Sequence, residues 1–205
     1  MKKLSIILLT LLVMLNLVAC SDSKKDQDNS SISVETIEEK IINAIGKDNY
    51  LCDTDIDADW LTNSFGLDLT KVESYIAKQN SISSVNLDTV IILKVKDGYS
   101  DEAINTLNKS FAQTVDYIRQ YPFGTAKVLN GRLYQKDNYV IYVIAGANYE
   151  GEDLQEESKL AIDEYAKIDA ALNELFNSTL ENLAIVPESN TTNQNSQESL
   201  PAFGG

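Results

Sequence analysis

Four aspartates alternate along one short segment of the chain: Asp53, Asp55, Asp57 and Asp59. This spacing is typical of the start of a calcium loop, whose oxygen ligands come from positions 1, 3 and 5. Two diagnostic positions differ, because Ala58 stands where the sharp turn needs glycine and Ser64 where a bidentate glutamate belongs. We therefore predict a solvated acidic loop in which Asp57 or Asp59 caps the next helix. The alternative is a weak calcium site, and no other cofactor is expected.

Aromatic residues form the second group that could bind a ligand. Four tyrosines follow one another late in the chain: Tyr134, Tyr139, Tyr142 and Tyr149. Tyrosines at strand spacing usually cover a sheet or its edge, and the alternative is a surface that binds glycan or peptide. The single tryptophan, Trp60, is predicted to pack a helix onto the core.

The sequence contains no histidine, which excludes Ser-His-Asp and Cys-His triads and histidine-ligated zinc. It also lacks a glycine-rich phosphate-binding pattern. Of the two cysteines, Cys52 is predicted to be a small hydrophobic residue rather than a nucleophile. We therefore expect a protein that is not an enzyme. The catalytic alternative is a cell-wall glycan hydrolase that works with two carboxylates.

The amino terminus has the pattern of an export signal. Met1-Lys2-Lys3 precedes an uncharged and mostly apolar run over residues 4–17, which is shorter than the about 20 residues of a spanning helix. Leu17-Val18-Ala19-Cys20 resembles the lipobox of bacterial lipoproteins, with two aliphatic residues, a small residue and a cysteine. We expect cleavage between Ala19 and Cys20 and modification of the Cys20 thiol with diacylglycerol, whose acyl chains (palmitate, for example) give stable anchoring. The alternatives are an uncleaved anchor helix and plain secretion.

Charge narrows the range of partners. The chain has 17 Lys and Arg against 31 Asp and Glu, and loss of Lys2 and Lys3 with the leader brings the formal net charge to about −16. Such a surface repels phosphate backbones, so nucleic acid is not expected as a partner. The expected partners are the lipid bilayer, through acylated Cys20, and an unknown envelope protein or ligand. The expected location is the extracytoplasmic face of the cell membrane.

Composition divides the chain into four predicted segments. These are a signal peptide over residues 1–19, the lipidated cysteine with a flexible tether over 20–33, a globular domain over 34–186 and a disordered tail over 187–205. The globular segment is long enough for one domain with its own core.

Hydrophobic periodicity and capping residues place the elements of this domain. The predicted helices are Val34–Ile45 ended by Gly46, Asp57–Phe65, a helix capped by Ser100 and ended by Pro122, and Leu154–Leu180, with Leu154 on its apolar face. The predicted strands are Val72–Lys78, Thr89–Lys96, Thr125–Tyr134 and Tyr139–Ala145. Two turn signals compete in the last pair, Asn130-Gly131 and Lys136-Asp137-Asn138, and the second is favoured because it leaves two strands of useful length.

The predicted fold class is α+β, a single domain with a mainly antiparallel sheet of about four strands in two hairpins and about four helices. Val90–Leu93 and Val140–Ile144 are continuously apolar, which is typical of strands buried on both faces. We expect helices on both faces of the sheet, and the alternative is that a partner covers one face.

Several short motifs of this domain together resemble one known family. The motifs are Leu61 to Gly66-Leu67-Asp68, Val72-Glu73-Ser74-Tyr75, the strand Val90–Lys96, Asp97, the helix Asp101–Tyr117, Tyr121-Pro122 and Lys136-Asp137-Asn138-Tyr139-Val140. The pattern over Val34–Ala147 resembles the bacterial lipoproteins grouped under domain of unknown function 4358. It departs from them at Asp137, where such hairpins usually carry glycine. The resemblance implies a compartment and a fold, and it supplies no active-site residue.

The expected function is that of a non-catalytic binding or interaction module of the cell envelope, anchored by lipid. Besides the glycan hydrolase, an accessory solute-binding lipoprotein is an alternative.

Overall fold

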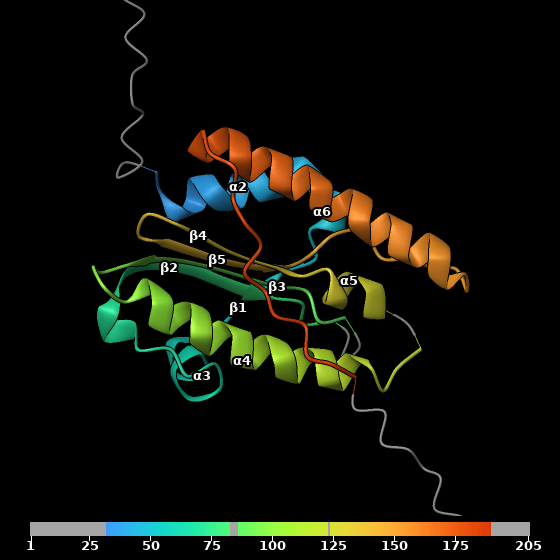
Figure 1. Cartoon of the computed structure of the whole chain (residues 1–205), viewed down its shortest axis with the longest axis horizontal. Coiled ribbons are helices and arrows are strands. Elements are labelled where there is room, and N and C mark those ends of the chain that lie inside the picture. Colours follow the sequence, from blue (N-terminus) through green and yellow to red (C-terminus); the bar gives the residue numbers. More distant parts are fainter. Residues whose placement is uncertain (1–31, 83–85, 123, 190–205) are drawn as a thin grey trace, which may run out of the picture. The chain divides into compact units, whose positions relative to one another are not determined.

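A five-stranded sheet lies between two layers of helices (Figure 1). The structure, a computed structural model, describes residues 32–82, 86–122 and 124–189. Its helices are α2 (Val34–Ile45), α3 (Ala58–Asn63), α4 (Ser100–Ile118), α5 (Thr125–Leu129) and α6 (Leu154–Phe176), with 3-10 turns η3 (Lys47–Asn49) and η4 (Leu69–Lys71). Its strands are β1 (Thr54–Asp55), β2 (Val72–Gln79), β3 (Thr89–Val95), β4 (Arg132–Lys136) and β5 (Tyr139–Ile144). The α+β class is therefore confirmed, with the two-residue β1 as an additional strand.

The sheet is antiparallel throughout and has the order β1-β2-β3-β5-β4. The central strand β3 lies between β2 and β5, so that Ile91 is opposite both Ala77 and Tyr142. Strands β4 and β5 form a hairpin with Lys136 opposite Tyr139. This confirms the favoured turn, whose first loop residue, Asp137, has the positive φ of 53° that aspartate tolerates better than most residues.

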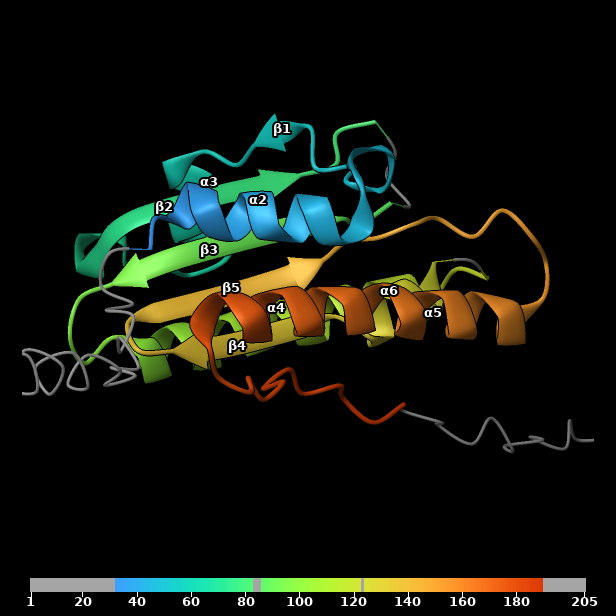
Figure 2. The same cartoon turned by 90° about the horizontal axis from the view of Figure 1, so that it is seen from above.

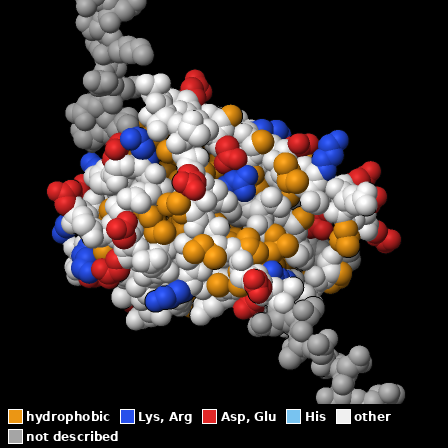
Figure 3. Space-filling model, in the orientation of Figure 1, with side chains coloured by type: hydrophobic (Ala, Val, Ile, Leu, Met, Phe, Trp, Pro, Cys, Tyr) orange, Lys and Arg blue, Asp and Glu red, His pale blue; other side chains and the backbone are white. Residues whose placement is uncertain are grey.

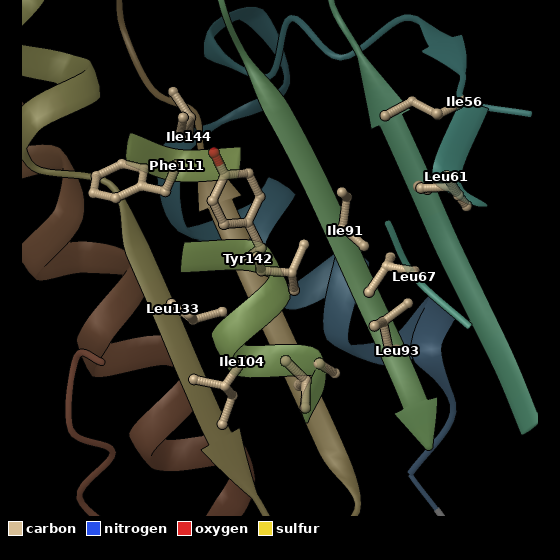
Figure 4. Packing of buried hydrophobic residues seen from close by; sticks show 14 of the residues in the cluster. Ile56, Leu61, Leu67, Ile91, Leu93, Ile104, Phe111, Leu133, Tyr142 and Ile144 are labelled. Atoms are coloured by element: carbon tan, nitrogen blue, oxygen red, sulfur yellow. The ribbon is translucent and has the colours of Figure 1, made fainter. Parts of the chain in front are cut away.

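Helices cover both faces of the sheet, as predicted. Along β3, Ile91 and Leu93 pack into a cluster with α3 and α4, while Val90 and Ile92 pack into a second cluster with α2 and α6. Figure 4 shows the first cluster, with Phe111 of α4 beside Tyr142 and Ile144 of β5. Figure 2 shows α2 and α6 side by side on the opposite face. Successive side chains of β3 point to opposite faces of the sheet and therefore pack into two separate hydrophobic cores.

The segment Thr125–Tyr134 is not one strand, which corrects the prediction. Its first half forms α5 and only the residues from Arg132 enter the sheet. Gly124 has a φ of 75°, which lets the chain turn sharply into the helix, and Val128 of that helix is buried in the core. The rejected turn at Asn130-Gly131 instead ends α5 and leads into β4.

Two helix ends and the exposure of one helix residue also differ from the prediction. Ser100 is the first residue of α4 and does not cap it, since the N-cap position is Tyr99. Helix α6 stops at Phe176 because Asn177 adopts a left-handed conformation with a φ of 47°. Leu154 begins that helix as an exposed residue, so it does not belong to the buried stripe.

The chain after α6 returns along the outer edge of β4 and then over α4 (Figure 1). The Leu183 amide donates to the carbonyl of Leu133 at 2.7 Å, and Asn182 Oδ1 accepts from the Leu133 amide at 3.0 Å. Further on, Arg119 donates to the carbonyl of Pro187 at 2.7 Å. This segment satisfies backbone groups on the exposed edge of the sheet. Ile185 of this segment is exposed. Figure 3 shows hydrophobic side chains lying between charged ones on this face of the molecule.

The predicted signal peptide (1–19), Cys20 and the tether up to residue 31 lie outside the described residues, and so do residues 190–205 of the predicted tail. Among the residues that the structure describes, no helix has both the length and the apolar character needed to cross a membrane.

Candidate functional site

A pocket of about 390 Å³ lies at the end of the sheet where β2 stops, β3 starts and β5 stops. We call it the end pocket. Its walls come from Asn80 after β2, Leu87 before β3, Lys127 of α5, Asn148 after β5 and Leu160 of α6. Its size falls within the range of small-molecule sites, which are mostly apolar with a few converging polar groups.

An ion pair is buried in the wall of this pocket. Lys127 Nζ lies 2.5 Å from Asp88 Oδ1, with the Lys127 side chain 10% exposed and the Asp88 side chain fully buried. The same ammonium donates to the carbonyl of Gly146 at 3.2 Å and to Asn148 Oδ1 at 2.6 Å. Apart from the ion pair, neither carboxylate oxygen of Asp88 has a hydrogen-bond partner among the described residues. Burial raises the pKa of Asp88 to about 6, and the attraction of Lys127 opposes this shift without cancelling it.

The position of α5, and therefore of Lys127, is fixed by contacts with α6. Tyr165 donates its hydroxyl hydrogen to the backbone carbonyl of Lys127 at 3.0 Å and accepts from the Ala145 amide at 3.3 Å. The guanidinium of Arg132 lies over the Tyr165 ring, 4.8 Å from its centroid, and donates twice to Asp169 at 3.1 Å. Burial raises the pKa of Tyr165, so its hydroxyl keeps its proton. Contacts from Tyr165 therefore hold the helix that carries Lys127 in place.

The opening of the end pocket carries polar groups of mixed kind. Asn80 donates from Nδ2 to the carbonyl of Leu51 at 2.9 Å. Glu157 Oε1 accepts from the amide of Ala126 at 3.4 Å, at the first turn of α5. Tyr149 donates to Glu156 at 2.9 Å. Amides, a carboxylate and a phenol around an apolar hollow can bind and orient a small polar ligand.

The four aspartates of the acidic segment do different things. Asp57 accepts from the Trp60 amide at 2.7 Å and so caps α3, as predicted. Asp53 accepts from the amide and the hydroxyl of Ser81, which holds β1 near the end of β2, and these hydrogen bonds lower its pKa. Asp55 belongs to β1 and Asp59 to the first turn of α3. Over the described ranges no group of three or more Cys, Asp or Glu side chains could hold a metal ion, so the calcium alternative has no assembled site there.

The predicted tyrosine cluster does not form one surface, which corrects that alternative. Tyr134 and Tyr139 are buried in the core beneath α2 and α6, whereas Tyr142 is buried on the opposite face against α4. Tyr149 is half-buried and lines the end pocket, so it is the one member of the four that can meet a ligand there.

Two other sequence-based expectations concern single residues. Cys52 is a free and buried thiol, and burial raises its pKa above the usual range, which fits the prediction of a small hydrophobic residue. Trp60 was predicted to pack α3 onto the core, and this is wrong. Its neighbour Leu61 makes that contact, while the indole ring is 53% exposed.

The residues that form the end pocket were not predicted from the sequence. Asp88 precedes an apolar strand and Lys127 lies in a segment predicted as a strand, and neither belongs to a motif. Lone charged residues of this kind are normally solvated, so no local signal indicates that they meet in the interior.

Comparison with known proteins gives a family for most of this domain. No curated protein and no solved structure matches the chain. A family model described as "Domain of unknown function (DUF4358)" matches residues 47–145, which run from η3 to the end of β5 and include Asp88 and Lys127. The match begins after α2 and ends before α6, although both helices cover the sheet. Residues 47–145, just under half of the 205-residue chain, therefore match the DUF4358 family model.

Proposed function

We propose that this protein is a lipid-anchored lipoprotein of the extracytoplasmic membrane face whose domain binds a small polar ligand in the end pocket without catalysis. The observation that carries the binding role is the pocket itself. It combines a volume of about 390 Å³ with a wall that the buried Asp88–Lys127 pair holds in place. A preformed hollow with few converging polar groups is typical of ligand sites.

The anchoring part of the proposal comes from the amino terminus. A cationic start, a short apolar run and the lipobox-like Leu17-Val18-Ala19-Cys20 support export and acylation of Cys20. Two acyl chains exceed the marginal binding of a single chain, so the attachment is expected to be stable. The strongly acidic domain is expected to stand away from an anionic bilayer surface.

A non-catalytic role fits the chemistry of the end pocket better than hydrolysis does. A glycan hydrolase needs two carboxylates that face each other across a cleft, one of them with a raised pKa. Asp88 has the raised pKa, but its side chain is fully buried and paired with Lys127 rather than exposed to the pocket. The ammonium of Lys127 already contacts three acceptors, on Asp88, Gly146 and Asn148, so its role is structural.

A thermal-shift screen with a pocket-filling variant tests this proposal. The probes are calcium, other divalent cations and disaccharide-peptide fragments of bacterial cell wall. A ligand at 100 times its Kd stabilises the folded state by about 2.7 kcal/mol, which is a rise in Tm of roughly 5–10 °C for a chain of this size. We expect such a rise with one small polar ligand.

The variant Ala147→Phe places a ring in the end pocket, because Ala147 lines it. The matched control is Ala166→Phe, at an exposed position of α6. The ligand-induced rise in Tm is expected to disappear in Ala147→Phe and to persist in Ala166→Phe. A rise that persists unchanged in Ala147→Phe would place binding elsewhere, and a flat panel would contradict a small ligand in favour of a protein partner.

A further inference from the structure

A second pocket lies between α3 and α4 and shares only one lining residue, Leu87, with the end pocket. It has a volume of about 260 Å³ and is lined by Trp60, Ser64 and Phe65 on one side and by Ser110, Gln113, Thr114 and Tyr117 on the other, with Leu87 between them. We call it the aromatic pocket. We propose that the aromatic pocket binds a neutral sugar ring of an oligosaccharide by stacking against Trp60 and Tyr117. This site goes beyond the proposed function, since its residues other than Leu87 take no part in the end pocket.

Two large aromatic side chains, those of Trp60 and Tyr117, are exposed at this pocket. Asp57 caps α3 by accepting from the Trp60 amide, and Leu61 anchors the same turn in the core, yet the indole is 53% exposed. Tyr117 is 38% exposed, and its hydroxyl oxygen accepts a hydrogen bond from Tyr121 at 3.0 Å. The rings of Tyr117 and Tyr121 lie 5.2 Å apart between centroids. The backbone of Trp60 and the ring of Tyr117 therefore have defined partners, while both aromatic rings are open to solvent.

The lack of charged residues in the lining limits the classes of ligand that the aromatic pocket can bind. None of its described lining residues is charged, although 23% of the residues in the chain are. A phosphate, a metal ion or a charged peptide would find no counter-charge in the lining, and burying an unpaired charge is costly. The ligand that fits the pocket is neutral.

The polar groups of the lining indicate a ligand with hydroxyl groups. Thr114 donates its hydroxyl hydrogen to the carbonyl of Ser110 at 3.0 Å, and Ser110 donates to the carbonyl of Phe65 at 3.5 Å. The Ser110 hydroxyl oxygen keeps lone pairs that can accept hydrogen bonds, and the exposed amide of Gln113 offers both donors and an acceptor. A wholly apolar ligand would leave these groups unused.

A sugar ring matches both halves of this lining. Its axial C–H groups carry a small positive charge and pack against the negative face of an aromatic ring, while its equatorial hydroxyls form hydrogen bonds around the rim. Leu87 lines the aromatic pocket and the end pocket alike, so the two pockets adjoin at this residue.

Trp60 provides a direct readout, since it is the only tryptophan in the chain. The full chain in detergent is titrated with two neutral oligosaccharides, the tetramer of N-acetylglucosamine and maltotetraose, while tryptophan emission is recorded. We expect a saturable change in emission with at least one of them. Tyr117→Ala and Gln113→Ala are each expected to raise the apparent Kd at least tenfold.

The matched control is Tyr75→Ala, because Tyr75 is 37% exposed on β2 and does not line the aromatic pocket. It is expected to leave the titration unchanged, and Ala147→Phe in the end pocket is expected to retain a saturable response. The variants are compared by circular dichroism, so that loss of folding is distinguished from loss of binding. The proposal is overturned if no saccharide gives a saturable response, if only an apolar probe such as Nile red or an uncharged aromatic peptide does, or if Tyr75→Ala weakens binding as much as Tyr117→Ala.

Discussion

The variant Lys127→Met removes the positive partner of a buried carboxylate and leaves Asp88 without its ion pair. Removing one member of a buried pair typically costs about 3–5 kcal/mol of stability, because an uncompensated charge remains in the interior. We expect a loss of this size at pH 8. The measurement is urea unfolding of wild type and variant, followed by circular dichroism at several pH values.

The dependence on pH makes this prediction specific to Asp88. In the wild type its pKa is about 6 in the folded state, above the value of an unfolded carboxyl, so this residue's contribution to stability is full below about pH 4 and falls as the pH rises toward 6. Without Lys127 the pKa of Asp88 rises further, and the variant binds one proton more than wild type above pH 6. The cost of the substitution then grows by about 1.4 kcal/mol per pH unit, or up to about 3 kcal/mol between pH 6 and pH 8.

Two controls isolate this effect. The double variant Lys127→Met/Asp88→Asn lacks the buried carboxyl of residue 88. Its loss of stability relative to wild type is therefore not expected to increase between pH 6 and pH 8. Lys71→Met breaks an exposed pair with Glu102 at 2.8 Å and is expected to stay close to wild-type stability. The reasoning is refuted if Lys127→Met costs the same at pH 5 and pH 8, or if it costs no more than Lys71→Met.

Three further predictions concern single residues. Asp57→Ala should lower the free energy of unfolding by about 1 kcal/mol through loss of the α3 cap, whereas Asp59→Ala should not, as urea titrations can show; equal effects would contradict the assigned cap. Gly131→Ala should cost about 1–3 kcal/mol in the same assay, because its new Cβ would lie 2.8 Å from the ring of Phe111, and an unchanged midpoint would contradict this close approach. Cys52 should react with a thiol reagent only after unfolding, since it is buried and its pKa is raised, and rapid labelling of the native protein would contradict its burial.

Elements with strong local signals were predictable from the sequence. Helix α2 begins at Val34 because Ser33 accepts a hydrogen bond from the Thr36 amide at 3.2 Å, and it ends where Gly46 takes a φ of 85°. Such caps act within a single turn, so they can be read from neighbouring residues. The five-residue α5 has no comparable signal, and its formation depends on contacts with α4 and α6 that come from distant parts of the chain.

The candidate site residues were predicted less well than the helices. Tyr139 and Tyr142 are three residues apart on one strand and therefore point to opposite faces, which period-two alternation already implies. The Asp88–Lys127 pair depends on how α5 closes over the end of the sheet, and no local pattern in the sequence indicates that contact. Leu61 rather than Trp60 packs onto the core, because a short helix buries only a narrow stripe.

The proposed location of this domain depends on acylation of Cys20, so labelling of that residue is the most direct test of the account. Cells that express the full chain are fed radiolabelled palmitate, and the protein is recovered from the membrane fraction. We predict that label enters the wild-type polypeptide and that Cys20→Ser abolishes both labelling and membrane retention. Absence of label from the wild type, or equal labelling of Cys20→Ser, would contradict the proposal of a lipid-anchored extracytoplasmic binding protein.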